Sequence, residues 1–163
     1  MTTKRTSRRR TLEIAAGAAA VVVVAKAAEA ATPNVVGVWK LAGGAMTDPG
    51  GKSVGVPYGP RGMGLVSLTS DGRMMAVLID GRAKLPDGAK REYSSYCGNY
   101  TFDGSTLITT VDASSDPARL ASQQVRKVRF EGDRMILVPP ERDDGGVKIH
   151  RELIWERIST VSL

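Results

Sequence analysis

Residues 63–79 read MGLVSLTSDGRMMAVLI, two apolar runs separated by the turn Ser70-Asp71-Gly72. An Asp-Gly pair between apolar runs favours a tight hairpin, because glycine accepts a positive φ without steric cost. This stretch therefore predicts two neighbouring antiparallel strands, Met63–Thr69 and Arg73–Ile79.

The same alternation of apolar runs and turn residues continues along the chain after Pro33. The further runs are Val35–Ala42, Lys52–Val56, Tyr93–Phe102, Leu107–Asp112, Gln123–Glu131, Met135–Val138 and Val147–Ile158. Only residues 117–124 favour a helical turn. Eight or nine strands joined by short turns predict an all-β antiparallel meander.

Several of these runs have one apolar face. In the last run Val147, Ile149, Leu153 and Trp155 alternate with Lys148, His150, Glu152 and Glu156. Alternation with a period of two indicates that one face of the strand is buried. A meander with a buried face keeps two exposed edges unless it closes. We therefore expect an up-and-down β-barrel of about eight strands, whose interior holds side chains or one small ligand.

The first and last predicted strands contain the motifs Gly37-Val38-Trp39 and Trp155-Glu156-Arg157. These motifs resemble the lipocalin signature, in which a C-terminal Arg packs over a Trp of the first strand. Between them, Pro57-Tyr58-Gly59, Gly64-Leu65-Val66, residues 70–74, residues 96–100 and Gln124-Val125-Arg126 follow the order of the bacterial and fungal lipocalin-like domain family. The resemblance covers residues 35–158. It implies a lipocalin-like barrel in which Gly37, Trp39, Trp155 and Arg157 have structural roles.

The resemblance is incomplete at two places. Pro117 is followed by Ala118-Arg119-Leu120, where the family commonly has Asn-Trp-Gly. Residues 109–112 read Thr-Thr-Val-Asp, where the family often has paired histidines before an acidic residue. Any role of those histidines therefore does not carry over to this chain.

The first 30 residues are typical of a targeting segment. Residues 7–12 read SRRRTL and resemble the twin-arginine export motif, and the uncharged run Ile14–Ala25 is well short of the ~20 residues that span a bilayer. Ala28-Glu29-Ala30 predicts cleavage after Ala30. We expect residues 1–30 to be a signal peptide for the twin-arginine translocase. An organelle transit peptide and an uncleaved membrane anchor are the alternatives.

The same interpretation assigns residues 31–163 to the barrel and places the mature protein in the periplasm or outside the cell, without a stable membrane span. The chain carries a net charge of +6, of which the leader accounts for about +4. The remainder has interspersed signs, whereas nucleic-acid binding needs a concentrated basic face. We therefore expect no nucleic-acid partner.

The counts of cysteine and histidine limit the chemistry. Cys97 is the only cysteine and His150 the only histidine. An internal disulfide, a multi-cysteine metal centre and a two-histidine metal site are therefore excluded. No metal or other cofactor is predicted.

Arg126 is the main candidate for a ligand contact. Counting by two from Val128 and Phe130 places its side chain toward the barrel interior. A buried guanidinium is costly unless it is paired, and a ligand carboxylate could pair with it through two hydrogen bonds. Pairing with an internal acid, or with water at the rim, is the alternative.

Four aromatic residues and one threonine complete the predicted ligand-binding set. Tyr96, Tyr100 and Phe102 share one face of their strand, Tyr58 lies in a turn near the barrel mouth, and Thr109 lies on the inward face of its strand. Aromatic rings with hydroxyl groups suit an apolar pocket that needs a few polar contacts. Simple packing of the core or of the turn is the alternative for these rings.

The sequence assigns no catalytic residue. No serine–histidine–aspartate spacing, metalloprotease motif, phosphate loop or dinucleotide fingerprint is present. A base could only be a carboxylate such as Asp112 or Glu92, and a tyrosine could serve as an acid. Cys97 has the opposite parity to Tyr96, so we expect it to face outward or to lie at a bulge. His150 falls on a polar face.

These observations predict an exported lipocalin-like barrel that binds a small, mostly apolar or amphipathic molecule, with or without a carboxylate or other anionic group. A metal-free cyclase or isomerase on the same barrel is the first alternative. A filled barrel that serves as a structural or interaction module is the second, and an interior blocked by Met135, Leu137 and the aromatic rings would favour it.

Overall fold

The structure is a computed structural model, and it describes residues 34–160. The predicted leader, its cleavage site after Ala30 and the domain boundary at residue 31 lie outside these residues. The strands are β1 (Gly37–Thr47), β2 (Ser53–Gly55), β3 (Gly62–Leu68), β4 (Arg73–Asp80), β5 (Tyr93–Phe102), β6 (Thr106–Ser114), β7 (Gln123–Glu131), β8 (Arg134–Val138), β9 (Arg142–Asp144) and β10 (Val147–Ser159). A single 3₁₀ turn, η1 (Pro117–Arg119), lies between β6 and β7.

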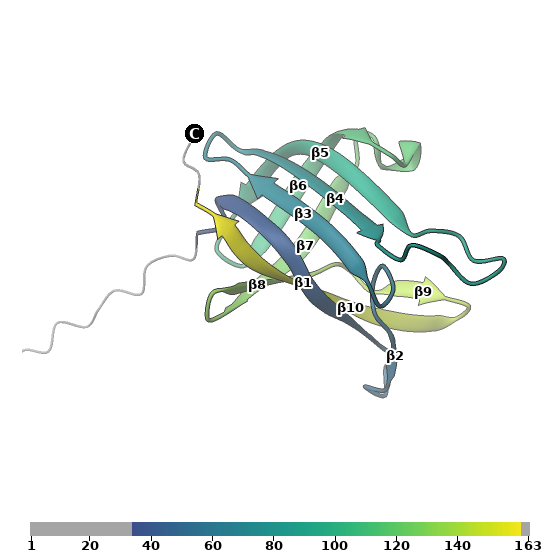
Figure 1. The fold of residues 1–163 in the computed structure, drawn as a ribbon. Helices are drawn as coiled ribbons and strands as arrows, with labels where there is room; N and C mark the ends of the chain where they lie inside the picture. Colours follow the sequence, from purple (N-terminus) through teal and green to yellow (C-terminus); the bar gives the residue numbers. More distant parts are fainter. Residues whose placement is uncertain (1–33, 161–163) are drawn as a thin grey trace, which may run out of the picture. The chain divides into compact units, whose positions relative to one another are not determined.

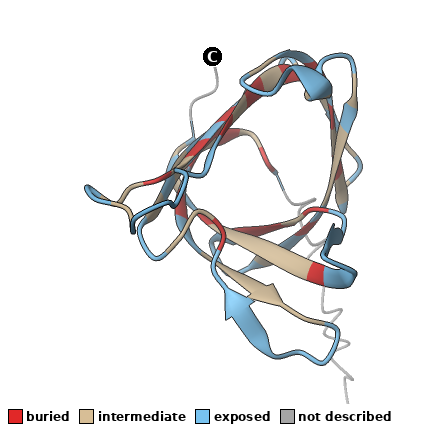
Figure 2. Ribbon diagram, turned by 90° about the vertical axis from the view of Figure 1, so that its right-hand side faces the viewer, coloured by how far each residue is buried: buried red, intermediate tan, exposed pale blue. Residues whose placement is uncertain are grey.

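Eight of the strands close into an antiparallel up-and-down barrel. They follow the order β1-β3-β4-β5-β6-β7-β8-β10, and β10 pairs with β1 to complete the ring (Figure 1). Figure 2 looks through this ring, with buried positions recurring along the strands. The predicted all-β, lipocalin-like barrel of about eight strands is confirmed. Within residues 34–160 no helix has the length and apolar character of a membrane span.

Two short strands lie outside the ring. β2 pairs with the end of β1, and β9 pairs with the start of β10. The pattern of the sequence missed β9, because Arg142-Asp143-Asp144 contains no apolar residue. It also ended the first strand at Ala42, whereas β1 continues to Thr47 beyond a bulge between Leu41 and Gly43 in the pairing with β10.

The hairpin of residues 63–79 forms as predicted. β3 and β4 pair from Gly62 opposite Asp80 to Leu68 opposite Met74. Gly72 has a φ of 85°, and the Thr69 N–H donates to the Arg73 carbonyl oxygen at 2.9 Å. The turn therefore has the positive φ that the Asp-Gly pair supplies without strain.

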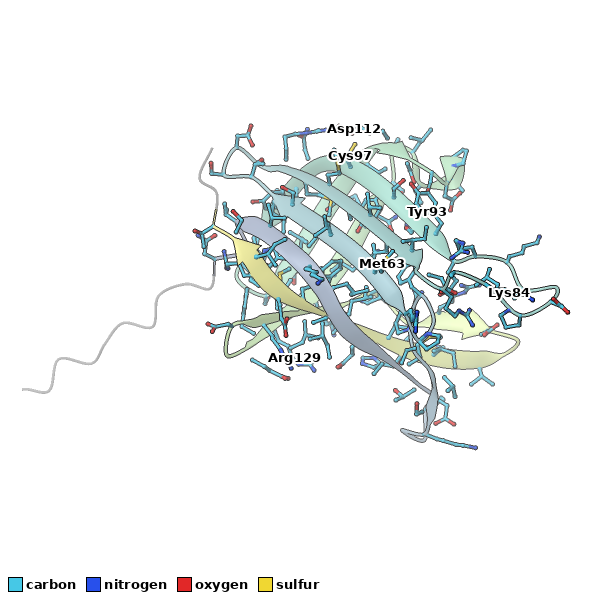
Figure 3. The ribbon with its side chains drawn as sticks, viewed as in Figure 1. Met63, Lys84, Tyr93, Cys97, Asp112 and Arg129 are labelled. Atoms are coloured by element: carbon cyan, nitrogen blue, oxygen red, sulfur yellow. The ribbon has the colours of Figure 1, made fainter. Side chains whose placement is uncertain are left out.

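A glycine allows β5 and β6 to approach closely. The pairing of these strands shifts by one residue between Cys97 and Gly98. A Cβ atom at Gly98 would lie 1.9 Å from the Thr110 carbonyl oxygen. Only a residue without a side chain fits at this bulge. Cys97 is half-buried, and its Sγ lies 3.4 Å from Oδ1 of Asp112 on the outer wall (Figure 3).

The core fills the end of the barrel that holds the start of β1 and the end of β10. Trp39 is buried there, its ring centroid lies 6.2 Å from that of Phe130, and its indole N–H donates to the Val35 carbonyl oxygen at 2.9 Å. The Arg157 guanidinium covers the Trp39 ring with its Cζ 4.0 Å from the ring centroid. The apolar side chains of this end are therefore covered by a cation and by the chain before β1.

Candidate ligand-binding site

The opposite end of the barrel is framed by four connections. The loops β2–β3, β4–β5, β6–β7 and β8–β10 all lie at this end, because consecutive strands of the meander alternate in direction. The β4–β5 loop, which carries Lys84, extends away from the barrel wall (Figure 3). We call this end the mouth.

An inner cavity of about 50 Å³ lies inside the barrel below the mouth. Its apolar wall consists of Val66, Met74, Ala76, Leu78, Leu137, Leu153 and Trp155. Its polar lining consists of Tyr58, Ser94, Tyr96, Arg119, Arg126 and Arg151. The volume admits a few water molecules, far less than the ~300–1,000 Å³ of pockets that enclose drug-sized ligands.

A wider polar pocket of about 480 Å³ lies at the mouth. It shares Pro57, Tyr58, Ser94, Arg119 and Arg151 with the inner cavity. Its other charged lining residues are Arg91, Glu92, Arg142 and Asp144. The two spaces therefore form one site with a basic, polar entrance and an apolar floor.

Arg126 points into this site from β7. Its guanidinium donates to the Val125 carbonyl oxygen at 2.7 Å and to Oε1 of Gln124 at 3.2 Å. Within residues 34–160 no carboxylate forms an ion pair with it. Its charge is therefore hydrogen-bonded only to neutral groups, which leaves an anion as a favourable further partner.

Arg119 reaches the site from η1. Asp116 caps that turn by accepting from the Ala118 N–H, and its carboxylate lies 3.6 Å from Nε of Arg119. The Arg119 guanidinium crosses to β5, where it donates to Oγ of Ser94 at 2.8 Å and lies 5.7 Å from the Tyr96 ring centroid. The side chain thus spans the mouth between two strands.

Arg151 and Trp155 both present buried donors without a partner. Among the described residues, the Nε of Arg151 and the Nε1 of Trp155 are the two buried side-chain nitrogen or oxygen atoms that lack a hydrogen bond. Both residues belong to β10 and line the inner cavity. Burial lowers the pKa of the Arg151 guanidinium, and the charges of Arg126 and Arg142 lower this pKa further. Unpaired buried donors are rare and costly, so this wall favours an acceptor.

Tyr58 adopts a backbone conformation that is strained for a side chain of its size. Its φ is 62°, and its N–H donates to Oε2 of Glu92 at 2.6 Å. Burial raises the pKa of its phenol, while a hydrogen bond with Ser94 and the charge of Arg119 oppose that rise. Strain of this kind persists where the surrounding structure enforces it, often at functional sites.

The structure brings three of the six predicted ligand-binding residues together. Arg126, Tyr96 and Tyr58 line the inner cavity. Tyr100, Phe102 and Thr109 lie outside its lining: the Tyr100 hydroxyl donates to the Thr69 carbonyl oxygen at 2.8 Å, and Thr109 is buried opposite Tyr100. These three residues share the inward face but lie closer to the opposite end.

Three polar residues that line the inner cavity were not predicted: Ser94, Arg119 and Arg151. Arg151 has the same parity as Leu153 and Trp155, so the alternation of β10 already contained the signal that it faces inward. Ser94 has the parity of Tyr96 and could have been found in the same way. Arg119 lies on η1, where no periodicity indicates the direction of a side chain.

The remaining titratable candidates lie on the outside or at the rim. Asp112 forms an ion pair with Arg73 on the outer wall, and His150 lies 3.2 Å from Glu152. Glu92 lines the mouth, where it accepts from the Tyr58 N–H. Among residues 34–160 no group of three or more His, Cys, Asp or Glu side chains is arranged to hold a metal ion.

The outer wall of the barrel has a separate apolar hollow of about 620 Å³ over β1, β3 and β4. Met63, Leu65, Met75 and Val77 are exposed along it, and Lys40 is its one charged lining residue (Figure 3 labels Met63). This hollow lacks convergent polar groups to orient a small ligand. The mouth and inner cavity therefore form the better small-molecule site.

Comparison with known proteins gives one match. The model of the lipocalin-like domain family matches residues 36–158, nearly the whole barrel. No curated protein and no solved structure matches the chain. The match agrees in position with the motifs that run from Gly37 to Arg157.

Proposed function

We propose that this chain, which belongs to the lipocalin-like domain family, binds a small amphipathic molecule whose anionic group lies among the arginines of the mouth. The family and the closed barrel support a ligand-binding protein in general. The anionic character and the location of the ligand are the specific parts of this proposal.

The main support for an anionic ligand comes from two hydrogen-bond donors on β10 that lack a partner. The Arg151 Nε and the Trp155 Nε1 are buried without a partner, and both residues line a cavity whose lining contains no carboxylate. A ligand with carboxylate or similar oxygens supplies acceptors for such donors, and charge-assisted hydrogen bonds are about twice as strong as neutral ones. Arg126 on β7, which is separated from β10 by β8 alone, adds a second cation without an acidic partner.

The small inner cavity limits how the ligand is bound. With about 50 Å³ inside and about 480 Å³ at the mouth, most of the ligand occupies the entrance. The filled interior gives some support to the alternative of a structural module. The cluster of cations at the mouth favours binding, because a buried charge without a paired counter-charge is costly.

The predicted signal peptide indicates the compartment in which the protein meets its ligand. A twin-arginine signal in residues 7–12 directs the folded barrel through the translocase, so the ligand would be met in the periplasm or outside the cell. This part of the proposal is independent of the barrel's ligand, and its test is separate.

The binding test uses the two tryptophans as reporters in nuclear magnetic resonance spectra of the ¹⁵N-labelled full-length protein. Trp155 lines the cavity, whereas Trp39 lies in the core at the other end and serves as an internal control. Benzoate should shift the indole signal of Trp155 in a saturable manner and leave that of Trp39 unchanged. The neutral analogue benzamide should bind at least tenfold more weakly.

Arg126→Met then tests the contribution of the charge. This variant keeps much of the volume of the side chain, and an apolar replacement of a buried charge is often tolerated. Its affinity for benzoate should fall by roughly 10- to 100-fold, which corresponds to the loss of a charged hydrogen bond. Lys127→Met removes the same charge from the exposed face of the same strand and should change nothing. Equal affinities of the wild type and Arg126→Met would contradict the proposal.

A further inference from the structure

The charges around the site do not balance. Arg119, Arg126 and Arg151 line the inner cavity, and no acidic residue does. Arg119 has Asp116 at 3.6 Å as a counter-charge. Within residues 34–160, Arg126 and Arg151 form no ion pair, and the charge of Glu92 only partly opposes the lowering of the Arg151 pKa.

These two charges lie close enough to oppose one another. The charge of Arg126 contributes to the lowered pKa of Arg151, together with burial and the charge of Arg142. Arg142 itself lies at the mouth, where Glu92 and Asp144 also contribute negative charge. Arg151 lines both the mouth and the inner cavity, and Arg126 lines the inner cavity. One negative charge would neutralise only one of these two guanidinium groups.

The shape of the cavity limits the size of the apolar part of a ligand. The floor formed by Leu137, Leu153 and Trp155 leaves about 50 Å³. A long alkyl chain cannot enter this volume, whereas the wider mouth can hold a polar head group.

We propose that the site binds a compact organic molecule with two negative charges, which lie between Arg126 and Arg151, and that only a short apolar part enters the barrel. This inference rests on the proposed function and names its ligand class. A short dicarboxylate and a phosphate monoester share the required chemistry. Long-chain monocarboxylates lack both the second charge and the compact form.

Matched pairs of probes test the charge. Glutarate and pentanoate share a five-carbon chain but differ by one charge, and phenyl phosphate and benzoate differ likewise at pH 8. Affinity is measured from the Trp155 indole signal of the full-length protein. In at least one pair the dianion should bind tenfold more tightly or better, as expected for one further charge-assisted hydrogen bond. The pair with the larger ratio of dianion affinity to monoanion affinity shows whether the site prefers a dicarboxylate or a phosphate monoester.

Substitution of either arginine should abolish this preference. Arg151→Met and Arg126→Met should each reduce the ratio of the two affinities to below threefold, because one cation remains. Lys148→Met, on the exposed face of β10, should keep the wild-type ratio. If Arg151→Met does not fold, Arg126→Met decides the outcome alone.

Monocarboxylates of different chain length test how large an apolar group can enter the barrel. A fully buried methylene is worth about fourfold in affinity, so octanoate would bind about 60-fold more tightly than pentanoate if its chain entered the barrel. The proposal expects a gain below tenfold.

The outcomes separate the two proposals. This inference is wrong and the proposed function stands in either of two cases. In the first, monoanions bind at Trp155 and in neither pair does the dianion bind at least tenfold more tightly; in the second, octanoate binds at least tenfold more tightly than pentanoate. If neither class shifts the Trp155 signal, both are wrong.

Discussion

The Arg157 guanidinium lies over Trp39 with its Cζ 4.0 Å from the ring centroid, and it also donates to the Val36 and Asn34 carbonyl oxygens. One side chain of β10 thereby fixes both the core tryptophan and the chain that enters β1. A contact of this kind contributes roughly 0.5–2 kcal/mol depending on burial. The larger contribution comes from the buried area of Trp39.

Trp39→Ala should therefore destabilise the barrel by about 3–5 kcal/mol, the range for removing a large buried aromatic side chain. Urea denaturation measures the loss. Trp39→Phe keeps a ring under Arg157 and should lose less. At temperatures where the variants are folded, benzoate should bind to them as to the wild type, because Trp39 lies outside the cavity lining. An unchanged melting temperature for Trp39→Ala would show that this residue does not stabilise the closed end.

Gly98→Ala should destabilise the protein more than an ordinary change within a strand. The added methyl group would meet the Thr110 carbonyl oxygen at 1.9 Å, so β5 and β6 must separate. Overpacking of this kind costs roughly 1–3 kcal/mol or more. Gly43→Ala is the matched control, because no atom lies within 4 Å of a Cβ at Gly43. Equal losses for the two variants in thermal melting would be inconsistent with the close approach at the bulge.

The sequence alone predicted which side chains of each strand point inward. It did not predict where along the barrel axis each of them lies. Tyr96 and Phe102 share a face of β5, yet they lie about 20 Å apart along the strand at roughly 3.3 Å per residue. Tyr96 consequently lines the cavity, while Phe102 packs against the core. Period-two alternation contains no information on which end of the barrel stays open.

Arg151 and Arg119 were missed for different physical reasons. Arg151 has the parity of the inward residues of β10. It was missed because inward positions were recognised by their apolar side chains, and Arg151 is charged. The position of Arg119 depends on the cap that Asp116 forms on η1 and on the hydrogen bond with Ser94 across the mouth. Such contacts between distant segments arise only in the folded chain. The cavity volume depends likewise on how facing side chains meet.

The predicted export route can be tested without the ligand. In the predicted twin-arginine motif, Arg8 and Arg9 occupy the paired positions. Replacing both by Lys keeps the positive charge and should hold the precursor in the cytoplasm. Fractionation and mass determination of the mature N-terminus measure the outcome. Arg5→Lys is the control outside the pair. Normal export of the double variant would contradict the assignment.

The stability of the barrel in acid should depend on Glu152. Arg129 on β7 donates to both of its carboxylate oxygens, at 2.8 and 2.9 Å. This contact, with a smaller contribution from His150, lowers the pKa of Glu152 to about 2 from an ordinary value of 4.5. A depressed pKa in the folded state stabilises the protein above the unfolded value of about 4.5, and this contribution is lost as the pH falls toward 2. The pair lies on the outer face of the barrel, where Figure 3 shows Arg129.

Glu152→Gln should therefore lower the free energy of unfolding at pH 7, and the difference from the wild type should shrink between about pH 4.5 and pH 2. Urea denaturation at a series of pH values measures it. Glu156→Gln removes an exposed carboxylate from the same strand, where it pairs with Arg134 at 2.8 Å. Because exposed ion pairs contribute about 0–1 kcal/mol, this control should have the smaller effect at pH 7. A difference between wild type and Glu152→Gln that stays constant from pH 7 to pH 2 would mean that the Arg129 contact does not hold the Glu152 carboxylate in its charged form.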